Sequence, residues 1–345
     1  MDIPLNPWRG RGLPDDVLSD APWPSVDAER PEFLLSRCPA AAPTPLVPCS
    51  GFGARVMVKD ERQRMGLGSF KALGAAYVIA HEAAATGFTD LSDALSGRVY
   101  VTASAGNHGL SVAAGARIFG ARAVIFLAET VPESFAARLR GKGAEVIRAG
   151  QEYEASMNAA SLAARDNGWT LLSDSSWPGY FDLPHRLMEG YLAMAAEITG
   201  AMPDAPDLVM LQAGVGGLAG ACATWFRQAW GDGPRIVVVE PEAAPALRDS
   251  IAAGRPVTAD GPVSSMGRLD CKAPSLIALK GLARDADAFV TVSDAQAAAV
   301  LPQLESQGLA TTESGAAGLA ALRAMTPQPG REDRVLVILS EEAEM

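Results

Sequence analysis

Basic residues, cysteines and long apolar runs are all scarce in this sequence of 345 residues. Lys and Arg number 29 against 40 Asp and Glu, which gives a formal net charge of −11 at pH 7. Nucleic-acid backbones and anionic membranes require a basic surface, so neither is an expected partner. Any anion that the chain binds must be held by local groups.

The four cysteines are too few and too widely spaced to cross-link a chain of this length. They are Cys38, Cys49, Cys222 and Cys271, without CxxC spacing, and they indicate a reducing compartment without a metal site. The first residues lack a basic stretch followed by an apolar one, and no run of about 18 apolar residues occurs anywhere. We therefore expect a cytoplasmic protein that is neither exported nor inserted in a membrane.

The residues that are abundant describe an ordinary globular enzyme. Hydrophobic residues make up 48% of the composition and charged residues 20%, the range typical of soluble folded chains. A chain of this length exceeds the size at which one core usually stops growing, so we expect about two domains.

The chain beyond residue 50 alternates between two kinds of periodicity. Short β-rich apolar runs are separated by longer segments of helical period, which predicts βαβ units and a parallel sheet covered by helices. The predicted strands are residues 55–58, 99–102, 123–127, 145–148, 170–172, 208–211, 236–239, 288–292 and 335–339. The first fifty residues are rich in proline and predict an irregular arm.

This pattern predicts an α/β protein of two three-layer domains with mainly parallel, twisted sheets. We expect an arm at 1–40, a large domain from 41–85 plus 200–345, and a small domain at 86–199, with the site in the cleft between the domains. Gly200, Pro203 and Pro206 interrupt the pattern near one boundary. The stretch 253–274 has no clear period, and so long a loop in a compact domain indicates a functional role.

Lys71 lies near the start of an alanine-rich segment, 69–85, for which a helix is predicted. It follows a glycine-containing turn, GLGSF at 66–70. The positive end of a helix dipole disfavours an ammonium there, and burial acts in the same direction. An amine with a lowered pKa can form a Schiff base. An ordinary surface lysine is the alternative.

A polar turn, TASAGNHG at 102–109, follows the predicted strand 99–102. Backbone N–H groups and the Asn107 amide would there face a ligand at the carboxyl edge of a parallel sheet. Such a turn can hold a carboxylate or a ring hydroxyl. His108 could equally be a hydrogen-bonded structural residue.

A glycine loop, QAGVGGLAG at 212–220, follows another predicted strand and opens a helix. Its backbone amides can approach a phosphate, whose charge the helix dipole favours. The nucleotide P-loop does not fit, because no Lys-Ser/Thr pair follows. A dinucleotide fold is a weaker competitor that rests on Gly214, Gly216 and Glu240.

Ser340 follows the last predicted strand directly. A hydroxyl at the carboxyl end of a central strand can hydrogen-bond a heteroaromatic nitrogen without forcing its protonation. A merely polar chain terminus is the alternative.

Taken together and in this order, these segments resemble the fold type II pyridoxal-phosphate enzymes of the tryptophan-synthase-β-like superfamily, and within it the diaminopropionate ammonia-lyases. The resemblance covers nearly the whole chain from residue 43. It includes PTPL at 43–46, KDE at 59–61, GLGSFK at 66–71, AGNHG at 105–109, DSSWPGY at 174–180, QAGVG at 212–216, VEP at 239–241 and ESGA at 313–316.

The resemblance implies roles for particular residues around pyridoxal 5′-phosphate. Lys71 would anchor the cofactor and act as the base, and Asp174 would serve the leaving group. The other implied cofactor contacts are Phe70, Asn107, Gly214, Val215, Gly216, Gly217, Leu218 and Ser340. The implied substrate contacts are Ser104, Ala105, Gly106 and His108. A neutral hydroxyl partner for the pyridine nitrogen would favour β-elimination over transamination.

Two positions depart from the resemblance. Ala105 stands where an acidic residue, thought to serve the D-enantiomer, commonly stands in these ammonia-lyases, and alanine cannot accept a proton. Glu342 replaces a glycine. A turn cap is the alternative role for Asp174, and a solvated loop is the alternative to a specificity element at 266–270.

The resulting hypothesis is a lyase that eliminates a polar β-substituent from a small L-amino acid, with 2,3-diaminopropionate as the first candidate. A serine/threonine-type or 3-hydroxyaspartate-type dehydratase is the main alternative. A non-catalytic amino-acid-binding protein and a nicotinamide-dependent oxidoreductase are weaker ones. The resemblance also implies a homodimer.

Overall fold

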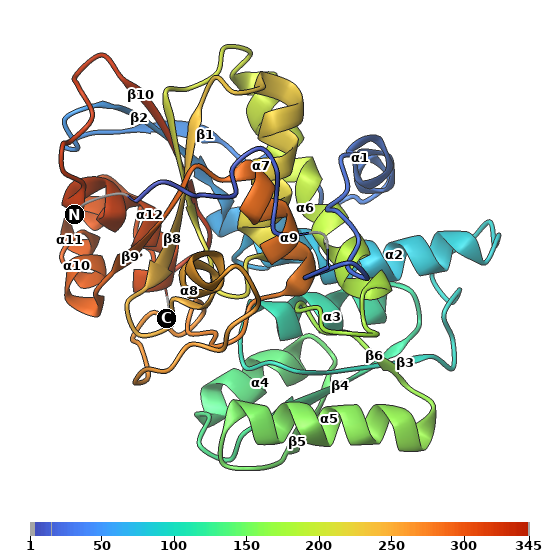
Figure 1. Ribbon diagram of the computed structural model, residues 1–345. Coiled ribbons are helices and arrows are strands. Elements are labelled where there is room, and N and C mark those ends of the chain that lie inside the picture. Colours follow the sequence, from blue (N-terminus) through green and yellow to red (C-terminus); the bar gives the residue numbers. More distant parts are fainter. Residues whose placement is uncertain (1–3, 15, 344–345) are drawn as a thin grey trace.

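The computed structural model describes residues 4–14 and 16–343. Two sheets organise the fold, one above the other in Figure 1. The strands are β1 (Leu46–Cys49), β2 (Arg55–Asp60), β3 (Val99–Ala103), β4 (Arg122–Leu127), β5 (Glu145–Arg148), β6 (Thr170–Leu171), β7 (Leu208–Gln212), β8 (Arg235–Pro241), β9 (Ala288–Val292) and β10 (Arg334–Leu339).

Helices cover both sheets. The α-helices are α1 (Glu29–Ser36), α2 (Ala75–Ala85), α3 (Asn107–Ile118), α4 (Glu133–Gly141), α5 (Tyr153–Asn167), α6 (Asp182–Ala201), α7 (Gly217–Trp230), α8 (Ala246–Ala253), α9 (Leu276–Asp285), α10 (Asp294–Ala298), α11 (Leu301–Ser306) and α12 (Glu313–Ala324). Two 3-10 turns, η1 (Glu61–Gly66) and η2 (Phe70–Leu73), lie between β2 and α2.

The larger sheet has six strands in the order β1-β2-β10-β7-β8-β9, and only the β1–β2 pair is antiparallel. Strand β10 shows why this sheet is buried on both faces. Leu336 and Ile338 join the core beneath α6, α7 and α9, whereas Val335, Val337 and Leu339 join the core beneath α12. Alternate side chains of one strand point to opposite faces, and the continuous apolar run fits a parallel strand between two helix layers.

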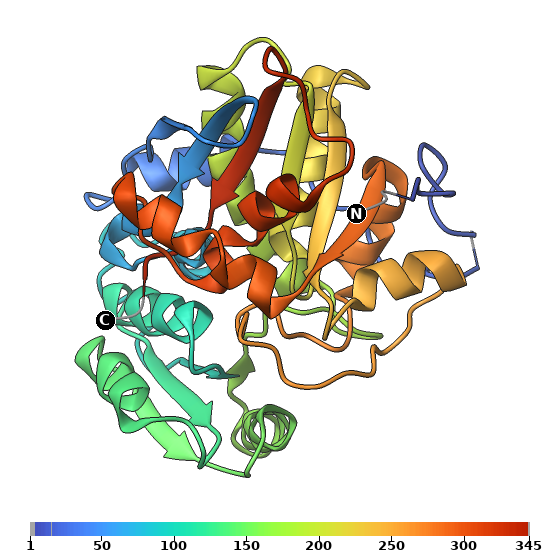
Figure 2. The same ribbon diagram turned by 90° about the vertical axis from the view of Figure 1, so that its left-hand side faces the viewer.

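The smaller sheet has the order β5-β4-β3-β6 and is entirely parallel. Helix α5 packs on one face, against Val101 and Val124, and α3 and α4 pack on the other. Figure 2 shows this sheet and its helices as a separate lobe below the larger one. The predicted fold class, two three-layer α/β units with mainly parallel sheets, is confirmed.

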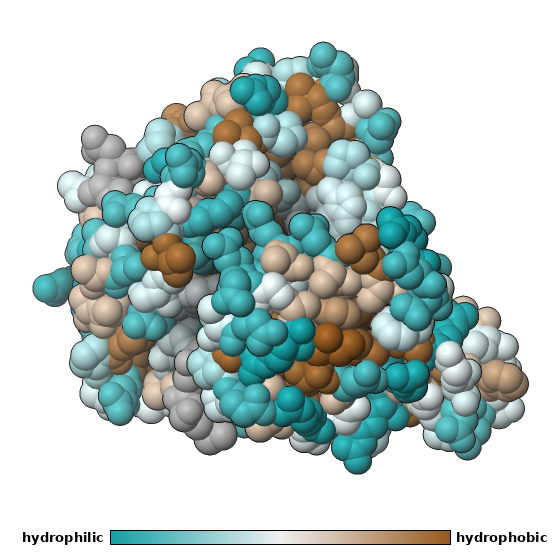
Figure 3. All heavy atoms as spheres, turned by 90° about the horizontal axis from the view of Figure 1, so that it is seen from below, coloured by the Kyte–Doolittle hydropathy of each residue, from teal (hydrophilic) through white to brown (hydrophobic). Residues whose placement is uncertain are grey.

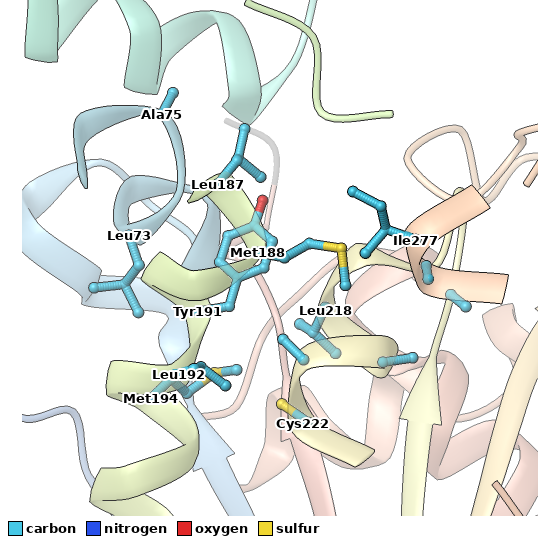
Figure 4. Close-up of a cluster of buried hydrophobic side chains, with 14 of the residues drawn as sticks. Leu73, Ala75, Leu187, Met188, Tyr191, Leu192, Met194, Leu218, Cys222 and Ile277 are labelled. Atoms are coloured by element: carbon cyan, nitrogen blue, oxygen red, sulfur yellow. The ribbon is translucent and has the colours of Figure 1, made fainter. Parts of the chain in front are cut away.

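The two lobes meet in a shared hydrophobic core. Figure 4 shows side chains of α6 between η2 and α7, with Met188 pointing toward Ile277. Helix α6 contacts both α7 and α2. The predicted division at residue 199 remains a prediction, and these contacts favour a boundary before α6.

The structure corrects the prediction at two places. The proline-rich stretch, predicted to be irregular, contains α1 and the edge strand β1. The predicted helix at 69–85 is divided at Gly74 into η2 and α2. Gly74 packs so closely on α6 that a Cβ there would lie 2.8 Å from Cε1 of Tyr191. Each of the nine predicted strands is present, with ends that differ by at most two residues from the observed ones.

Candidate active site

Lys71 lies in η2, where three features fix its position. Ser69 caps the turn, its Oγ accepting a hydrogen bond of 3.3 Å from the Lys71 backbone N–H. Nζ lies 5.2 Å from the Phe70 ring centroid and 5.9 Å from the Tyr191 ring centroid. These two rings meet edge to face, 4.9 Å apart, so the amine is held between aromatic surfaces.

Asp174 is the ionic partner of Lys71, with Nζ donating to Oδ2 at 2.6 Å and 21% of each side chain exposed. Burial alone would lower the pKa of Lys71, but the Asp174 carboxylate raises it well above its usual range. Burial likewise opposes ionisation of Asp174, and the Lys71 ammonium still holds the pKa of Asp174 well below its usual range. The predicted lowering of the Lys71 pKa is therefore wrong for the cofactor-free chain, because the paired charge outweighs desolvation.

The predicted turn at 104–109 connects β3 to α3. Its shape is set by Ser104, whose Oγ accepts from the backbone N–H groups of Gly106 and Gly109, both at 3.2 Å. Gly109 must be small, because a Cβ there would lie 2.6 Å from the Ser104 carbonyl oxygen. Ala105 adds no polar group to this turn.

His108 is buried at the start of α3. Its Nε2 lies 2.8 Å from the Leu172 carbonyl oxygen, which can only accept, so Nε2 carries the proton. Nδ1 is then an acceptor, and it has no hydrogen-bond partner among the described residues. Burial lowers the pKa of His108, so the ring stays neutral at pH 7.

The glycine loop leads from β7 into α7. Gly216 has φ +100°, a left-handed conformation that glycine adopts without strain. In the described chain, the backbone N–H groups of Gly216, Gly217 and Leu218 have no hydrogen-bond partner. Unpaired amides at a helix N-terminus form an anion site, so this loop, including Gly214 and Val215, fits a phosphate group.

Ser340 directly follows β10, and its carbonyl oxygen accepts from the Phe70 backbone N–H at 3.1 Å. This contact brings the end of β10 beside η2. The next residue, Glu341, is 4% exposed and reaches Asn107, whose Nδ2 donates to Oε2 at 2.6 Å. The predicted residues at 71, 107, 174 and 340 are thus brought together from four distant segments.

Three residues of this site were missed by the sequence prediction. They are Glu341, which follows a buried strand, Tyr191, which lies in a helix, and Thr312, which precedes one. The local sequence around each is that of an ordinary strand end or helix. Burial raises the pKa of Tyr191 to about 12, and its hydroxyl has no hydrogen-bond partner within the described residues. A buried hydroxyl without a partner, close to Lys71, is a polar atom that a bound group could satisfy.

A pocket of about 240 Å³ opens beside Glu341. Its lining comes from loop 253–274, the start of α12 with the residues just before it, and the segment after β10. It consists of Ser265, Arg268, Thr311, Thr312, Glu313, Ser314 and Ala343. Arg268 Nε lies 3.0 Å from Oε2 of Glu341. The loop predicted to be a specificity element therefore reaches the site.

Glu240, which supported a dinucleotide site, has a structural role. Its carboxylate accepts from the backbone N–H groups of Leu247 and Arg248, at 2.7 and 2.8 Å, and so caps α8. Within residues 4–14 and 16–343, no cluster of three potential metal ligands occurs. None of the described helices is long and apolar enough to cross a membrane.

The sequence is similar to those of known enzymes. Diaminopropionate ammonia-lyase of Escherichia coli (strain K12) is 29% identical over 336 residues, covering 88% of this chain and 84% of that protein. The biosynthetic L-threonine dehydratase of Mycobacterium tuberculosis (strain ATCC 25618 / H37Rv) is 28% identical over 302 residues, covering 85% of this chain and 66% of that protein.

A similar solved structure is that of the Escherichia coli diaminopropionate ammonia-lyase in complex with D-serine. It superposes with a TM-score of 0.87 at 27% identity, covering 99% of this chain and 93% of that one. The family described as pyridoxal-phosphate dependent enzyme matches residues 38–341. The chain belongs to this family of pyridoxal-phosphate-dependent enzymes.

Proposed function

We propose that the chain is an ammonia-lyase that converts L-2,3-diaminopropionate and water to pyruvate and two molecules of ammonia. The observation that carries the proposal is the Lys71–Asp174 ion pair of 2.6 Å. A carboxylate beside the lysine can receive a positively charged β-amino group, which a hydroxyl-bearing substrate lacks.

Several residues would hold the cofactor. Lys71 would bind it covalently through Nζ, Asn107 would contact the ring hydroxyl, and Ser340 would face the ring nitrogen. The glycine loop from Gly214 to Leu218 would bind the phosphate. Pyridoxal phosphate, when bound, withdraws electrons from the substrate Cα and so makes its proton acidic.

The ion pair suggests how Lys71 becomes a base. While Asp174 is paired with Lys71, the amine keeps its proton, since the pKa of Lys71 lies above its usual range. A substrate β-ammonium bound to Asp174 would replace the lysine as its partner. Once the substrate α-amine had displaced Lys71 from the cofactor, the freed Lys71 amine, relieved of the carboxylate, would lose its proton more easily and could take the Cα proton.

Asp174 would then hold the β-ammonium, which already carries the proton with which it departs as ammonia. The β C–N bond breaks as the Cα proton moves to Lys71, and the first ammonia leaves. Water hydrolyses the remaining enamine to pyruvate and the second ammonia. The aromatic rings of Phe70 and Tyr191 shield Nζ from bulk water.

Dehydration of L-serine or L-threonine is the second candidate. It is favoured by the similarity to L-threonine dehydratase and by Ala105, which removes the acidic residue expected in the ammonia-lyases. Neutral β-hydroxyl groups would not compete with Lys71 for Asp174, so we expect lower rates with these substrates. Because alanine at position 105 cannot accept a proton from the D-enantiomer, we propose that the L-enantiomer is the substrate.

An absorbance experiment tests the proposal. The visible band of the bound cofactor is recorded before and after L-2,3-diaminopropionate, L-serine and L-threonine are added, while pyruvate or another 2-oxo acid is measured. We expect the band to change and pyruvate to accumulate with diaminopropionate. Lys71→Ala should lose both the band and the activity, and a band unchanged in that variant would contradict the assignment of Lys71.

Asp174→Asn separates the two candidate substrates. If Asp174 binds the β-ammonium, the substitution should lower kcat/KM for diaminopropionate by about 100-fold, because the charge-assisted contact with the ammonium group is lost. The rate with L-serine should fall much less. Equal losses with both substrates would count against a role of Asp174 in selecting the amine.

One face of the molecule, shown in Figure 3, carries apolar residues in a patch bordered by hydrophilic ones. We propose a homodimer and a cytoplasmic location, and light scattering at several protein concentrations would test the first.

A further inference from the structure

Glu341 makes more polar contacts than any other carboxylate of the site. Its side chain accepts from Asn107 Nδ2 at 2.6 Å and from the Thr312 hydroxyl, and it pairs with Arg268 Nε at 3.0 Å. Its carbonyl oxygen accepts from Thr311 Oγ1 at 2.5 Å. The side chain is fixed by groups from three segments, with 5% of it exposed.

The surrounding backbone is built to hold Glu341 in this place. An antiparallel bridge pairs it with Ser69, two residues before Lys71. Gly315 gives room, because a Cβ there would lie 2.1 Å from Thr311 Oγ1 and 3.3 Å from the Glu341 carbonyl oxygen. The carboxylate is therefore held rigidly beside the proposed cofactor site.

The contact with Asn107 fixes the orientation of an amide. A carboxylate with several donors around it acts only as an acceptor, so Asn107 must turn its NH₂ group toward Glu341. The Oδ1 atom of Asn107 is thereby directed away from Glu341, and the second N–H of its amide group has a defined direction. An amide without such a partner could flip and present either atom to a ligand.

We infer that Glu341 is a positioning residue that orients the Asn107 amide toward the cofactor ring. The inference rests on the proposed function, in which Asn107 contacts the ring hydroxyl. Glu341 acts through Asn107, so the effect of its removal must depend on the presence of that amide.

A double-mutant cycle tests this dependence. The dissociation constant for pyridoxal phosphate is measured by reconstituting the cofactor-free forms of the wild-type protein, Glu341→Ala, Asn107→Ala and the double variant. We expect Glu341→Ala to weaken binding about tenfold in the wild-type background, as the loss of an ordered charge-assisted contact would. In the Asn107→Ala background it should change binding by less than about twofold.

Glu341→Gln distinguishes orientation from charge and guards against misfolding. Glutamine keeps an acceptor for Asn107, so binding should recover most of the loss. Glu342→Gln is the matched control, since Glu342 pairs only loosely with Arg138, at 3.7 Å, and it should leave binding of pyridoxal phosphate unchanged.

An equal loss from Glu341→Ala in both backgrounds would overturn the inference, and so would unchanged binding in the wild-type background. In either case the wild-type band and its elimination activity would leave the proposed function standing. A wild-type protein that binds no pyridoxal phosphate would overturn both.

Discussion

The Lys71–Asp174 pair predicts a pH dependence of the cofactor-free protein. The raised pKa of Lys71 adds stability below its unfolded value of about 10.4, which is lost at higher pH. The lowered pKa of Asp174 adds stability above about 3.9, which is lost as pH falls. The contribution should be constant between about pH 5 and 9.

Denaturant unfolding of the cofactor-free wild type and Asp174→Asn measures this contribution. The difference in unfolding free energy should have a plateau across neutral pH and shrink below about pH 4. A difference that rises steadily from pH 5 to 9 would show that the two groups do not form the pair in solution.

Ala105 predicts stereochemical preference. Without a carboxylate at this position, the wild type should act on L-2,3-diaminopropionate and hardly on the D-enantiomer. Ala105→Asp should raise kcat/KM for the D-enantiomer by about tenfold or more, since it adds a general base. The rate ratio of the two enantiomers is the measurement, and Ala105→Asn, which has no basic group, should leave the D-rate low.

The sequence predicted the site residues that lie in recognisable motifs. It did not reveal those that reach the site only through contacts between distant segments. Lys71, Asn107, Gly216 and Ser340 occur in motifs or at strand ends, and the structure brings them together. The pKa of Lys71 was predicted with the wrong sign, because it depends on a carboxylate about one hundred residues away. No local pattern reveals such a contact.

At the scale of elements, the Lys272 ammonium group makes several of the contacts that hold loop 253–274. Lys272 Nζ donates to the carbonyl oxygens of Ala243 and Pro262, both at 2.8 Å, and to Asp270 Oδ1 at 2.6 Å. These contacts tie the loop to the turn after β8. Arg268, from the same loop, pairs with Glu341 in the site.

Lys272→Met should therefore loosen this loop. We expect faster proteolytic cleavage within 253–274 and a KM for substrate raised a few-fold, because Arg268 would be held less firmly. Limited proteolysis followed by mass spectrometry is the measurement. Lys280→Met is the matched control, since Lys280 also donates to two carbonyl oxygens, those of Leu18 and Ala21, and it should expose the N-terminal segment and leave the loop intact.

The break in the predicted helix at 69–85 shows the limit of local periodicity. The alanine-rich pattern is compatible with one continuous helix. In the structure η2 ends at Leu73 and α2 begins at Ala75, and Gly74 between them lies against Tyr191 of α6. The break places Lys71 in a short turn, which the local pattern does not show.

At the scale of the whole molecule, a buried ionic cluster joins β2, η1 and α6. Arg64 pairs with Glu61 and Glu197, both at 2.7 Å, and Lys59 also pairs with Glu197. Arg64 and Glu61 are 2% and 0% exposed. Burial opposes ionisation of Glu197, yet Arg64 and Lys59 keep the pKa of Glu197 below its usual value.

Arg64→Met should lower the unfolding free energy by about 3–5 kcal/mol, because it leaves buried carboxylates without their partner. Denaturant unfolding near pH 7 measures the loss. Arg122→Met removes a surface pair with Glu145, in which both side chains are more than half exposed, and should cost less than about 1 kcal/mol. Similar losses from both would contradict the role of burial.

The fold class was predictable because parallel strands leave a regular pattern of apolar runs separated by helical segments. The position of α6 was not predictable, since α6 packs against α2, which precedes it in the sequence, and α7, which follows it. Strand β1 was hidden by prolines. Pro48 is tolerated there because β1 lies at the edge of the sheet and pairs only with β2.

The opposite edge of the large sheet is closed by the N-terminal segment. Leu5 forms an antiparallel bridge with Ala288 of β9, and the Asn6 backbone N–H donates to the Asp287 carbonyl oxygen at 2.8 Å. An uncovered edge strand can pair with a second chain and start aggregation. Shortening the chain past Asn6 should therefore show itself first as self-association during purification, before any loss of catalysis.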